Sequence, residues 1–299
     1  ANHNVRTAIT AMRATSAKIF ADQSLVNVEG TIATVADIFH LQGADELEEA
    51  EKKYLPTSGK KYNAIILAAS QGEKFGDLVK DIPKALLKVN GVPILNTQID
   101  AFNRMGITDI TVVRGFGKDT IAVPGIKTVD NDEHAATKEL FSLYAARKAI
   151  KGNTVISYGD IVFKDHVLHE LINTETDISI VVDADTSSRN GYTDFVRADK
   201  PWSRSALNPQ VTLKEMSAKL AQADAQGEFI GLWKVNARGA AAVNEALERL
   251  AKREDFKSLR MADLFNELAA ATTVSVVYTR GAWIDIDSIV DLTQASELS

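Results

Sequence analysis

The sequence contains no cysteine and few prolines, with Cys 0 and Pro 6 among its 299 residues. The absence of cysteine excludes disulfide bonds, a thiolate nucleophile and any zinc or iron–sulfur site built from thiolates. Any metal chemistry in this protein must therefore use oxygen or nitrogen ligands, which makes hard, oxygen-bound cations the expected kind.

Long apolar runs and blocks of positive charge are also missing. The apolar run at residues 64–69 is far shorter than the roughly 20 residues of a membrane-spanning helix, and no basic segment followed by an apolar stretch marks a targeting signal. The net charge is -6, and no run of Lys or Arg exceeds two. We therefore expect a cytoplasmic, globular protein that binds neither membranes nor nucleic acid. Binding of a small anionic substrate is still compatible with this charge, because local basic residues can provide a binding site for it.

The pattern of the chain changes near residue 57. Before it, apolar residues recur at helical spacing in residues 5–20, 31–40 and 44–54. A Pro-Thr-Ser-Gly sequence follows at residues 56–59, where Pro disfavours a preceding helix and Gly favours a flexible joint. We therefore predict a helical tail at residues 1–56, a linker at 57–61 and a second domain at 62–299.

The second domain alternates short apolar runs with amphipathic stretches. Strands are predicted at residues 64–68, 110–113, 154–158 and 178–182, and helices at 94–105, 133–150 and 166–172. This alternation predicts an α/β fold with a mostly parallel, doubly wound sheet, whose ligand site lies at the carboxyl ends of the strands. Further strands at residues 192–196, 210–213 and 229–235 interrupt the alternation before helices at 240–250 and 261–268.

A loop of small residues follows the first predicted strand of this domain. The loop consists of Ala68, Ala69, Ser70, Gln71 and Gly72, and its small residues let backbone N–H groups approach a phosphate closely. Neither G-x-x-x-x-G-K-[ST] nor G-x-G-x-x-G is present, which argues against a Walker ATPase and a dinucleotide oxidoreductase. A purely structural turn would have the same composition.

The loop and the segment after it resemble the signature of nucleotidyltransferases. Residues 68–76 read AASQGEKFG and residues 83–95 read PKALLKVNGVPIL, similar to that family's LAAGxGxR and PKxLLxVxGxPxL segments. The resemblance implies a Rossmann-like fold in which the loop binds a nucleotide and Lys74 and Lys84 are catalytic, holding positive charge against a triphosphate. Either lysine taken alone would be an ordinary surface charge. Ser70 for the family's Gly and Lys74 for its Arg are departures, and Lys cannot form the two-pronged contacts of Arg.

Three aspartates add to the predicted site. Asp160 ends an apolar strand in a Gly-Asp pair, and the resemblance makes it a catalytic and metal-binding residue. Asp285 and Asp287 are two residues apart, which places both on one side of an extended segment. We expect Asp160, Asp285 and Asp287 to hold Mg²⁺ against phosphate oxygens. For Asp287 an alternative role is the N-cap of a helix that begins near residue 288.

Two further segments supply predicted binding residues. Residues 130–143 resemble the family's N…T…SL segment, in which Ser142 would contact the base or ribose and Lys138 an anionic substrate. The two are four residues apart, on one face of a predicted helix, although an ordinary amphipathic helix has the same spacing. Glu228, in the GEFIGL sequence at residues 227–232, is a predicted substrate-binding residue by resemblance.

The resemblance is closest to the nucleotidyltransferases fused to phosphoenolpyruvate mutases of phosphonate biosynthesis. Residues 24–29 and 40–47 are similar to the carboxyl-terminal tail of such mutases, but the mutase EDKxxxKxNS loop is absent and no mutase activity is expected. The resemblance implies Mg²⁺-dependent transfer of CMP from CTP to a phosphonate such as 2-hydroxyethylphosphonate or 2-aminoethylphosphonate, with release of pyrophosphate.

Two other functions stay open at this point. A nucleotidyltransferase for phosphocholine or a sugar 1-phosphate shares the same clusters of residues. An inactive oligomerisation module is the alternative outside enzymes, because the apolar stripe of the tail needs a partner, and a second copy of the chain would provide one.

Overall fold

The computed structural model describes residues 24–26, 32–34, 60–71, 75, 82–185, 194–203 and 210–298. The chain divides into two compact units, Ala1–Gly59 with Trp202–Gln210, and Lys60–Pro201 with Val211–Ser299.

In the first unit, β1 (Ser24–Val26) and β2 (Ile32–Thr34) form an antiparallel pair. The helix predicted at residues 31–40 is therefore wrong at 32–34, where the β-branched side chains of Ile32 and Thr34 favour extended backbone. The helices predicted at residues 5–20 and 44–54, and with them the predicted self-association of the tail, lie outside the described residues.

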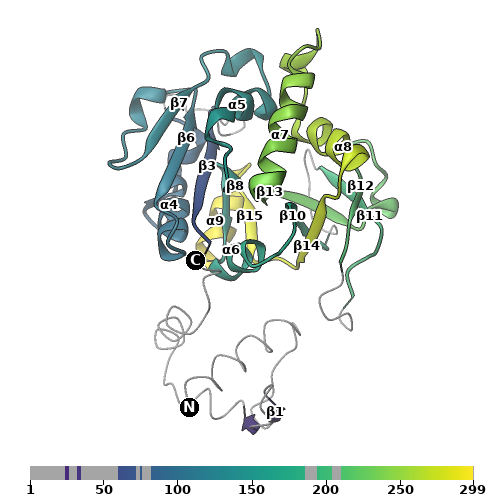
Figure 1. Ribbon diagram of the computed structural model, residues 1–299. Helices are drawn as coiled ribbons and strands as arrows, with labels where there is room; N and C mark the ends of the chain where they lie inside the picture. The colour runs from purple at the N-terminus through teal and green to yellow at the C-terminus, as the bar shows by residue number, and fades with distance from the viewer. Residues whose placement is uncertain are drawn as a thin grey trace. The chain divides into compact units, whose positions relative to one another are not determined.

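The second unit is built on a mixed sheet (Figure 1). Its main path runs through β7 (Lys127–Asp130), β6 (Asp109–Arg114), β3 (Tyr62–Ala68), β8 (Asn153–Tyr158), β13 (Gly227–Val235), β11 (Phe195–Ala198) and β12 (Leu213–Ser217). On the other side of β13, β10 (Ile178–Asp183) pairs antiparallel with it and parallel with β14 (Ser275–Thr279).

The predicted α/β class is confirmed, with parallel pairing concentrated in the part of the sheet that the sequence pattern shows most clearly. Strands β7, β6, β3 and β8 all run parallel. Strand β13 runs antiparallel to β8 and to β10, so the other part of the sheet is mixed. The strands predicted to interrupt the alternation are the ones that pair antiparallel with their neighbours. Among them, β12 begins at Leu213, the residue at which the predicted strand ended.

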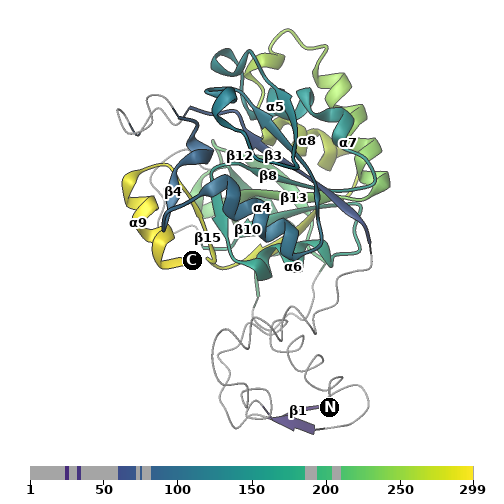
Figure 2. The ribbon, with the colours of Figure 1, turned by 90° about the vertical axis from the view of Figure 1, so that its left-hand side faces the viewer.

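Strand β3 shows how the sequence divides the two faces of the sheet. All of its residues are buried, as expected for a strand covered on both sides. Ile65 and Leu67 pack in one core, and Ala64 and Ile66, on the opposite face, pack in another. The first core includes residues of α5 (Glu139–Ala145), α7 (Ala237–Leu250) and α8 (Met261–Ala271), and the second includes residues of α4 (Ile94–Arg104) and α6 (Asp165–Ile172). Figure 2 shows α4 and α6 on the face toward the viewer.

The long helix predicted at residues 133–150 is wrong. The segment contains a 3-10 turn at His134–Ala136, the short helix α5, and a second 3-10 turn at Arg147–Ala149. Thr137 and Lys138 are extended, with φ of -129° and -106°. The Thr137 hydroxyl donates to the carbonyl of Glu133 at 3.0 Å, a side-chain bond that competes with helix formation.

Small elements join the carboxyl edge of the sheet to the end of the chain. Strand β9 (Ile161–Phe163) pairs antiparallel with β15 (Trp283–Asp285), and β4 (Lys88–Val89) pairs with β5 (Val92–Pro93). The last helix, α9 (Ile289–Leu298), contributes Ala295 to a third core with Leu87 and Val89. Among the described helices, none is long and apolar enough to cross a membrane.

Gly231 allows β13 to pass close to an aromatic ring. Its φ is +82°, and a Cβ atom at this position would lie 2.5 Å from Cδ2 of Tyr158. Gly125 has a nearly identical φ of +81° but no atom within 4 Å of such a Cβ. A comparison of Gly231 with Gly125 therefore separates the cost of backbone strain from the cost of crowding by a neighbouring side chain.

We predict that Gly125→Ala lowers the free energy of unfolding by about 1–2 kcal/mol, the cost of a left-handed conformation with a Cβ atom. Gly231→Ala should lose about 1–3 kcal/mol more, because the Tyr158 ring must move. Urea denaturation of both variants measures the difference. Equal losses would show that the ring approach imposes no constraint.

Candidate active site

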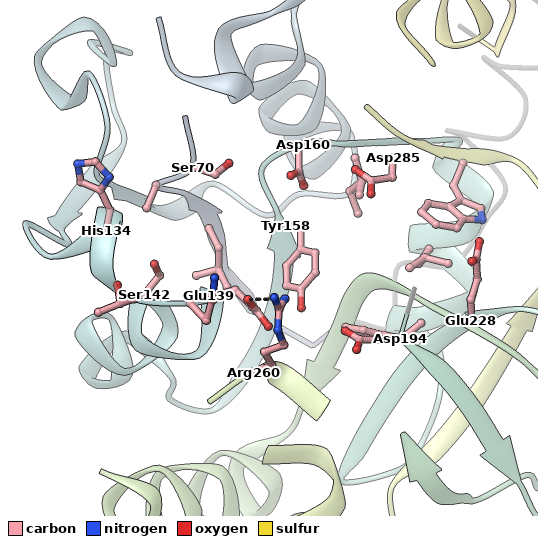
Figure 3. Close-up of a pocket in the computed structure, with 18 residues that line it drawn as sticks. Ser70, His134, Glu139, Ser142, Tyr158, Asp160, Asp194, Glu228, Arg260 and Asp285 are labelled. Atoms are coloured by element: carbon pink, nitrogen blue, oxygen red, sulfur yellow. Dashed lines mark ion pairs between the residues drawn. The ribbon is translucent and has the colours of Figure 1, made fainter. Parts of the chain in front are cut away.

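A cavity of about 330 Å³ lies at the carboxyl edge of the sheet, where parallel β3 and β8 both end. Figure 3 shows Asp160 and Asp285 close together at one side of it, with Tyr158 between the Ser70 side and the Glu228 side. Its wall contains these predicted site residues: Ala69, Ser70, Lys138, Ser142, Asp160, Glu228 and Asp285. The structure thus brings together residues that are widely separated in the sequence.

The loop after β3 is held by two glycines from neighbouring segments. A Cβ atom at Gly159 would lie 2.8 Å from the Leu67 carbonyl oxygen, and one at Gly115 would lie 2.7 Å from that of Ala69. The N–H of Gly159 donates to Leu67 at 2.9 Å. Only glycine permits these close backbone contacts, which fix the end of β3 against the strand that leads to Asp160.

The small-residue loop reaches the cavity through its middle. Ala68 is buried, Ser70 is exposed at the cavity wall, and Gln71 is half-buried. The carbonyl oxygen of Ser70 accepts the backbone N–H of Lys84 at 3.3 Å, which ties the two predicted phosphate-binding segments together. Gly72 and Lys74 lie outside the described residues.

Lys84 is the centre of an ionic cluster. Its side chain lies in a 3-10 turn (Lys84–Leu86), and the residue is 6% exposed. Its Nζ donates to Asp160 Oδ2 at 2.8 Å and to Asp287 Oδ1 at 2.6 Å, and it lies 3.6 Å from Asp285 Oδ1. Four predicted site residues from three segments therefore meet at one ammonium group.

The neighbouring carboxylates determine the protonation state of Lys84. Burial by itself lowers the pKa of Lys84, but the carboxylates of Asp160, Asp285 and Asp287 outweigh that effect and raise the pKa above its usual value. Lys84 is therefore a permanent cation at physiological pH. The side chains of Asp160, Asp285 and Asp287 are 21%, 36% and 33% exposed, and those of Asp160 and Asp285 line the cavity.

The donor chemistry of this cluster suits a hard divalent cation, because three carboxylates face a single ammonium. As arranged here, Lys84 Nζ takes the central position. In the ranges that the structure describes, no three acidic or histidine side chains are spaced to hold one ion. The Mg²⁺ role of Asp160, Asp285 and Asp287 stays a prediction.

The capping role considered for Asp287 is wrong. Its carboxylate bonds to Lys84, whereas the Ser288 hydroxyl accepts the backbone N–H of Asp291 at 3.3 Å in the first turn of α9. The Asp291 carboxylate in turn accepts the N–H of Asp287 at 2.9 Å. The first turn of α9 thus holds the backbone of Asp287, and the carboxylate of Asp287 is directed at Lys84.

The strand that carries Asp285 is anchored by a buried carboxylate. Asp183, at the end of β10, is 3% exposed and accepts the indole N–H of Trp283 at 2.7 Å. It also accepts the backbone N–H of Gly281 at 3.2 Å and that of Asp185 at 3.0 Å. Several donors offset the cost of burying the charge, and the bond to Trp283 fixes a residue of the cavity wall two positions before Asp285.

The predicted nucleotide-binding serine belongs to a buried network. Ser142 is 5% exposed and accepts from Asn131 Nδ2 at 3.0 Å, and the same amide donates to Thr137 Oγ1 at 3.1 Å. Lys138 is exposed at the N-cap position of α5. Lys138 and Ser142 both line the cavity, but they do not share the continuous helix that was predicted.

Several residues of the wall were not predicted from the sequence. Asp194 is 8% exposed and lies at the end of the cavity away from Ser142, as does the predicted residue Glu228, which is 2% exposed. Arg260 Nη1 lies 3.9 Å from Glu139 Oε2, across the cavity wall (Figure 3). Tyr158 could have been found from the sequence, because it directly precedes the Gly-Asp pair, whereas the others are brought in by the packing of β13 and α8.

Residues 64–259 match the family described as the MobA-like NTP transferase domain. The chain belongs to this family. Its fold is that of a nucleotidyltransferase, an enzyme class that uses a nucleoside triphosphate and a small phosphate-bearing substrate. The mixed α/β sheet and the site at its carboxyl edge are the features on which that activity rests.

Curated relatives include several cytidylyltransferases. The chain is 28% identical over 259 residues to CTP:phosphoglutamine cytidylyltransferase of Campylobacter jejuni, covering 77% of this chain and 97% of that protein. It is 35% identical over 115 residues to 2-aminoethylphosphonate cytidylyltransferase of Lancefieldella rimae, covering 36% of this chain and 47% of that protein. A match to phosphoenolpyruvate phosphomutase of Tetrahymena pyriformis is 56% identical over 55 residues, 18% of each chain. The chain thus spans less than half of the last two proteins.

Solved structures show the same fold at low sequence identity. CTP:phosphocholine cytidylyltransferase from Streptococcus pneumoniae is similar with a TM-score of 0.62 and 21% identity, over 80% of this chain and 99% of that chain. The inositol-1-phosphate CTP transferase from T. maritima is similar with a TM-score of 0.65 and 15% identity, over 80% and 95%.

We predict that Lys84→Met lowers the free energy of unfolding by about 1–3 kcal/mol. This is less than the 3–5 kcal/mol for breaking a fully buried pair, because the aspartates are partly exposed. Because the pKa of Lys84 is raised, its stabilising effect in the unmodified protein is complete below pH 10.5 and is lost only as pH rises through the folded-state value.

Lys88→Met is the matched control, since Lys88 is an exposed lysine four residues along the chain. It should change stability by about 0.5 kcal/mol or less. Denaturant titrations at pH 7 compare the two variants. Equal losses at both positions would show that the cluster contributes nothing to folding.

Proposed function

We propose that this chain transfers CMP from CTP to a small phosphonate and releases pyrophosphate. The observation that carries the proposal is the meeting of Lys84, Asp160, Asp285 and Asp287 beside the small-residue loop at Ser70. A cation that is preorganised next to a phosphate-binding loop stabilises the charge that develops in phosphoryl-type transfer.

In the proposed reaction, a phosphonate oxygen attacks the α-phosphorus of CTP. The new P–O bond forms as the bond to the β-phosphate oxygen breaks, and the electron pair of that bond leaves with pyrophosphate. Lys84 neutralises charge on the phosphate oxygens, and the loop at Ala69 and Ser70 positions the triphosphate through its backbone. No covalent enzyme intermediate is needed.

Asp160, Asp285 and Asp287 are the residues that would hold Mg²⁺. When bound, the ion neutralises two anions that otherwise repel each other and polarises the phosphoryl oxygen. The partial exposure of all three carboxylates and their excess over the single Lys84 cation support this assignment.

Two relatives support the choice of CTP and a phosphonate. The L. rimae protein is a 2-aminoethylphosphonate cytidylyltransferase, and the 56% identical segment belongs to a protein named for phosphoenolpyruvate phosphomutase activity. A phosphoryl compound that is not a phosphonate is the second candidate acceptor, because the match to the phosphoglutamine enzyme extends over 97% of that protein.

A panel of donors and acceptors tests the proposal. Pyrophosphate release is measured with CTP, UTP, ATP and GTP against 2-aminoethylphosphonate, 2-hydroxyethylphosphonate, phosphocholine and phosphoglutamine, each with Mg²⁺. We expect CTP with a phosphonate to give the highest kcat/KM. Faster reaction with phosphocholine or phosphoglutamine would identify that compound, and not a phosphonate, as the acceptor. If no pair of substrates releases pyrophosphate, the proposed function is refuted.

We predict that Asp160→Asn and Asp285→Asn each lower kcat by about 100- to 1000-fold, the scale for removing one preorganised electrostatic group. Asp287→Asn should show a comparable loss, because its carboxylate bonds to Lys84. Excess Mg²⁺ should restore the activity only in part. Asp165→Asn, which alters a surface pair with Arg104, is the control and should keep normal turnover. Unchanged Mg²⁺ dependence in both the Asp160 and Asp285 variants would place the metal elsewhere.

A further inference from the structure

A buried glutamine brackets the turn that carries Asp160. Gln98 lies on α4 and is 1% exposed. Its Nε2 donates to the carbonyl oxygen of Tyr158 at 2.8 Å and to that of Ile161 at 2.7 Å. Its Oε1 accepts from the hydroxyl of Ser157 at 2.9 Å. One side chain therefore bonds to residues on both sides of the Gly159–Asp160 turn.

The surroundings define the orientation of this amide. In the reverse orientation, the amide oxygen would face two carbonyl oxygens, which are acceptors only, so Nε2 must be the atom directed at the turn. Both N–H groups and the oxygen then have partners within 2.9 Å. A fully bonded polar group in a buried position fixes geometry more tightly than apolar packing does, because each bond also has a direction.

The turn held by Gln98 connects directly to the second carboxylate. Ile161 is the β9 residue that pairs with Asp285 on β15. The carbonyl oxygen of Asp160 accepts the N–H of Ile286 at 3.0 Å, one residue past that strand. Displacement of the turn would thus move Asp160 and Asp285 together relative to Lys84.

We propose that Gln98 is a positioning residue for nucleotidyl transfer, which sets the location of Asp160 and, through the β9–β15 pair, of Asp285. This proposal rests on the proposed function for its catalytic effect. Helix α4 already packs through apolar residues such as Ile99 and Phe102, so attaching the helix to the sheet does not require the amide. The amide is the group that connects the helix to the backbone of the turn.

The test compares Gln98→Met with Ile99→Ala. Methionine keeps the length of the side chain and removes the donors, whereas Ile99→Ala removes packing from the same helix and keeps the amide. At a temperature where both variants are folded, Gln98→Met should lower kcat on the order of 100-fold, the effect of a misplacement of about 1 Å, with KM for CTP near that of the unmodified protein. Ile99→Ala should leave kcat nearly unchanged.

A second readout does not depend on activity. The amide hydrogen of Ile286 reports the position of the turn, because it donates to the Asp160 carbonyl. Its exchange with deuterium should be faster in Gln98→Met and unchanged in Ile99→Ala. Ser157→Ala removes the hydroxyl that donates to Oε1 and that also bonds to the Tyr158 carbonyl oxygen at 2.9 Å. It should change kcat and Ile286 exchange in the same direction by a smaller factor, and it replaces Gln98→Met if that variant fails to fold.

Each outcome decides between positioning and packing. Faster Ile286 exchange together with a loss of kcat supports the proposal. Unchanged exchange, or faster exchange at full kcat, overturns it, as would equal losses of kcat in Gln98→Met and Ile99→Ala. If the unmodified protein releases no pyrophosphate from any pair of substrates, the proposed function fails, and the exchange data alone then decide whether Gln98 holds the turn.

Discussion

The structure of this protein depends on one cation that holds three carboxylates together. Lys84 bonds to Asp160, 76 residues away, and to Asp287, 203 residues away. Without that ammonium group, the aspartates would repel one another at the edge of the sheet. Because Asp285 and Asp287 lie near the end of the chain, the same contact ties β15 and α9 to the parallel part of the sheet.

Hydrogen bonds outside the cluster hold its residues in position. Asp183 fixes Trp283 at the start of β15, Gln98 fixes the turn at Asp160, and Asp291 holds the backbone of Asp287. Reacting groups in enzymes need such supporting contacts, because small errors in their placement are costly to the rate. The order of strands alone brings the aspartates to the same edge, and these bonds then determine how the carboxylates face Lys84.

Much of the fold could be predicted from the sequence, where local patterns agree with the final packing. The buried run of β3 and the apolar positions of α4 are clear because both elements are long and regular. The meeting of the loop at Ser70 with Asp160 also follows from the sequence, since parallel strands end at the same edge. The short helix α5 could not be predicted, because extended backbone at Thr137 interrupts a pattern that looks continuous.

The rest of the site depends on contacts that have no local signal. Asp287 stands where a helix cap is expected, and its bond to Lys84 is visible only in three dimensions. Gln98 occupies one position on the apolar face of α4, and nothing near it in the sequence indicates that its partners lie 60 residues away, at Tyr158. The partners of both residues are determined by tertiary packing, which cannot be read from the spacing of residues in the sequence.

The position of the bound CTP α-phosphate tests whether the Lys84 cluster acts on the reacting group. In crystals grown with a CTP analogue that carries sulfur on the α-phosphorus, the anomalous signal of that sulfur marks the reacting atom. We predict a peak between the loop at Ser70 and the Lys84 cluster, within contact of Lys84 or Asp160. A peak elsewhere, with the nucleotide bound away from this edge of the sheet, would contradict it.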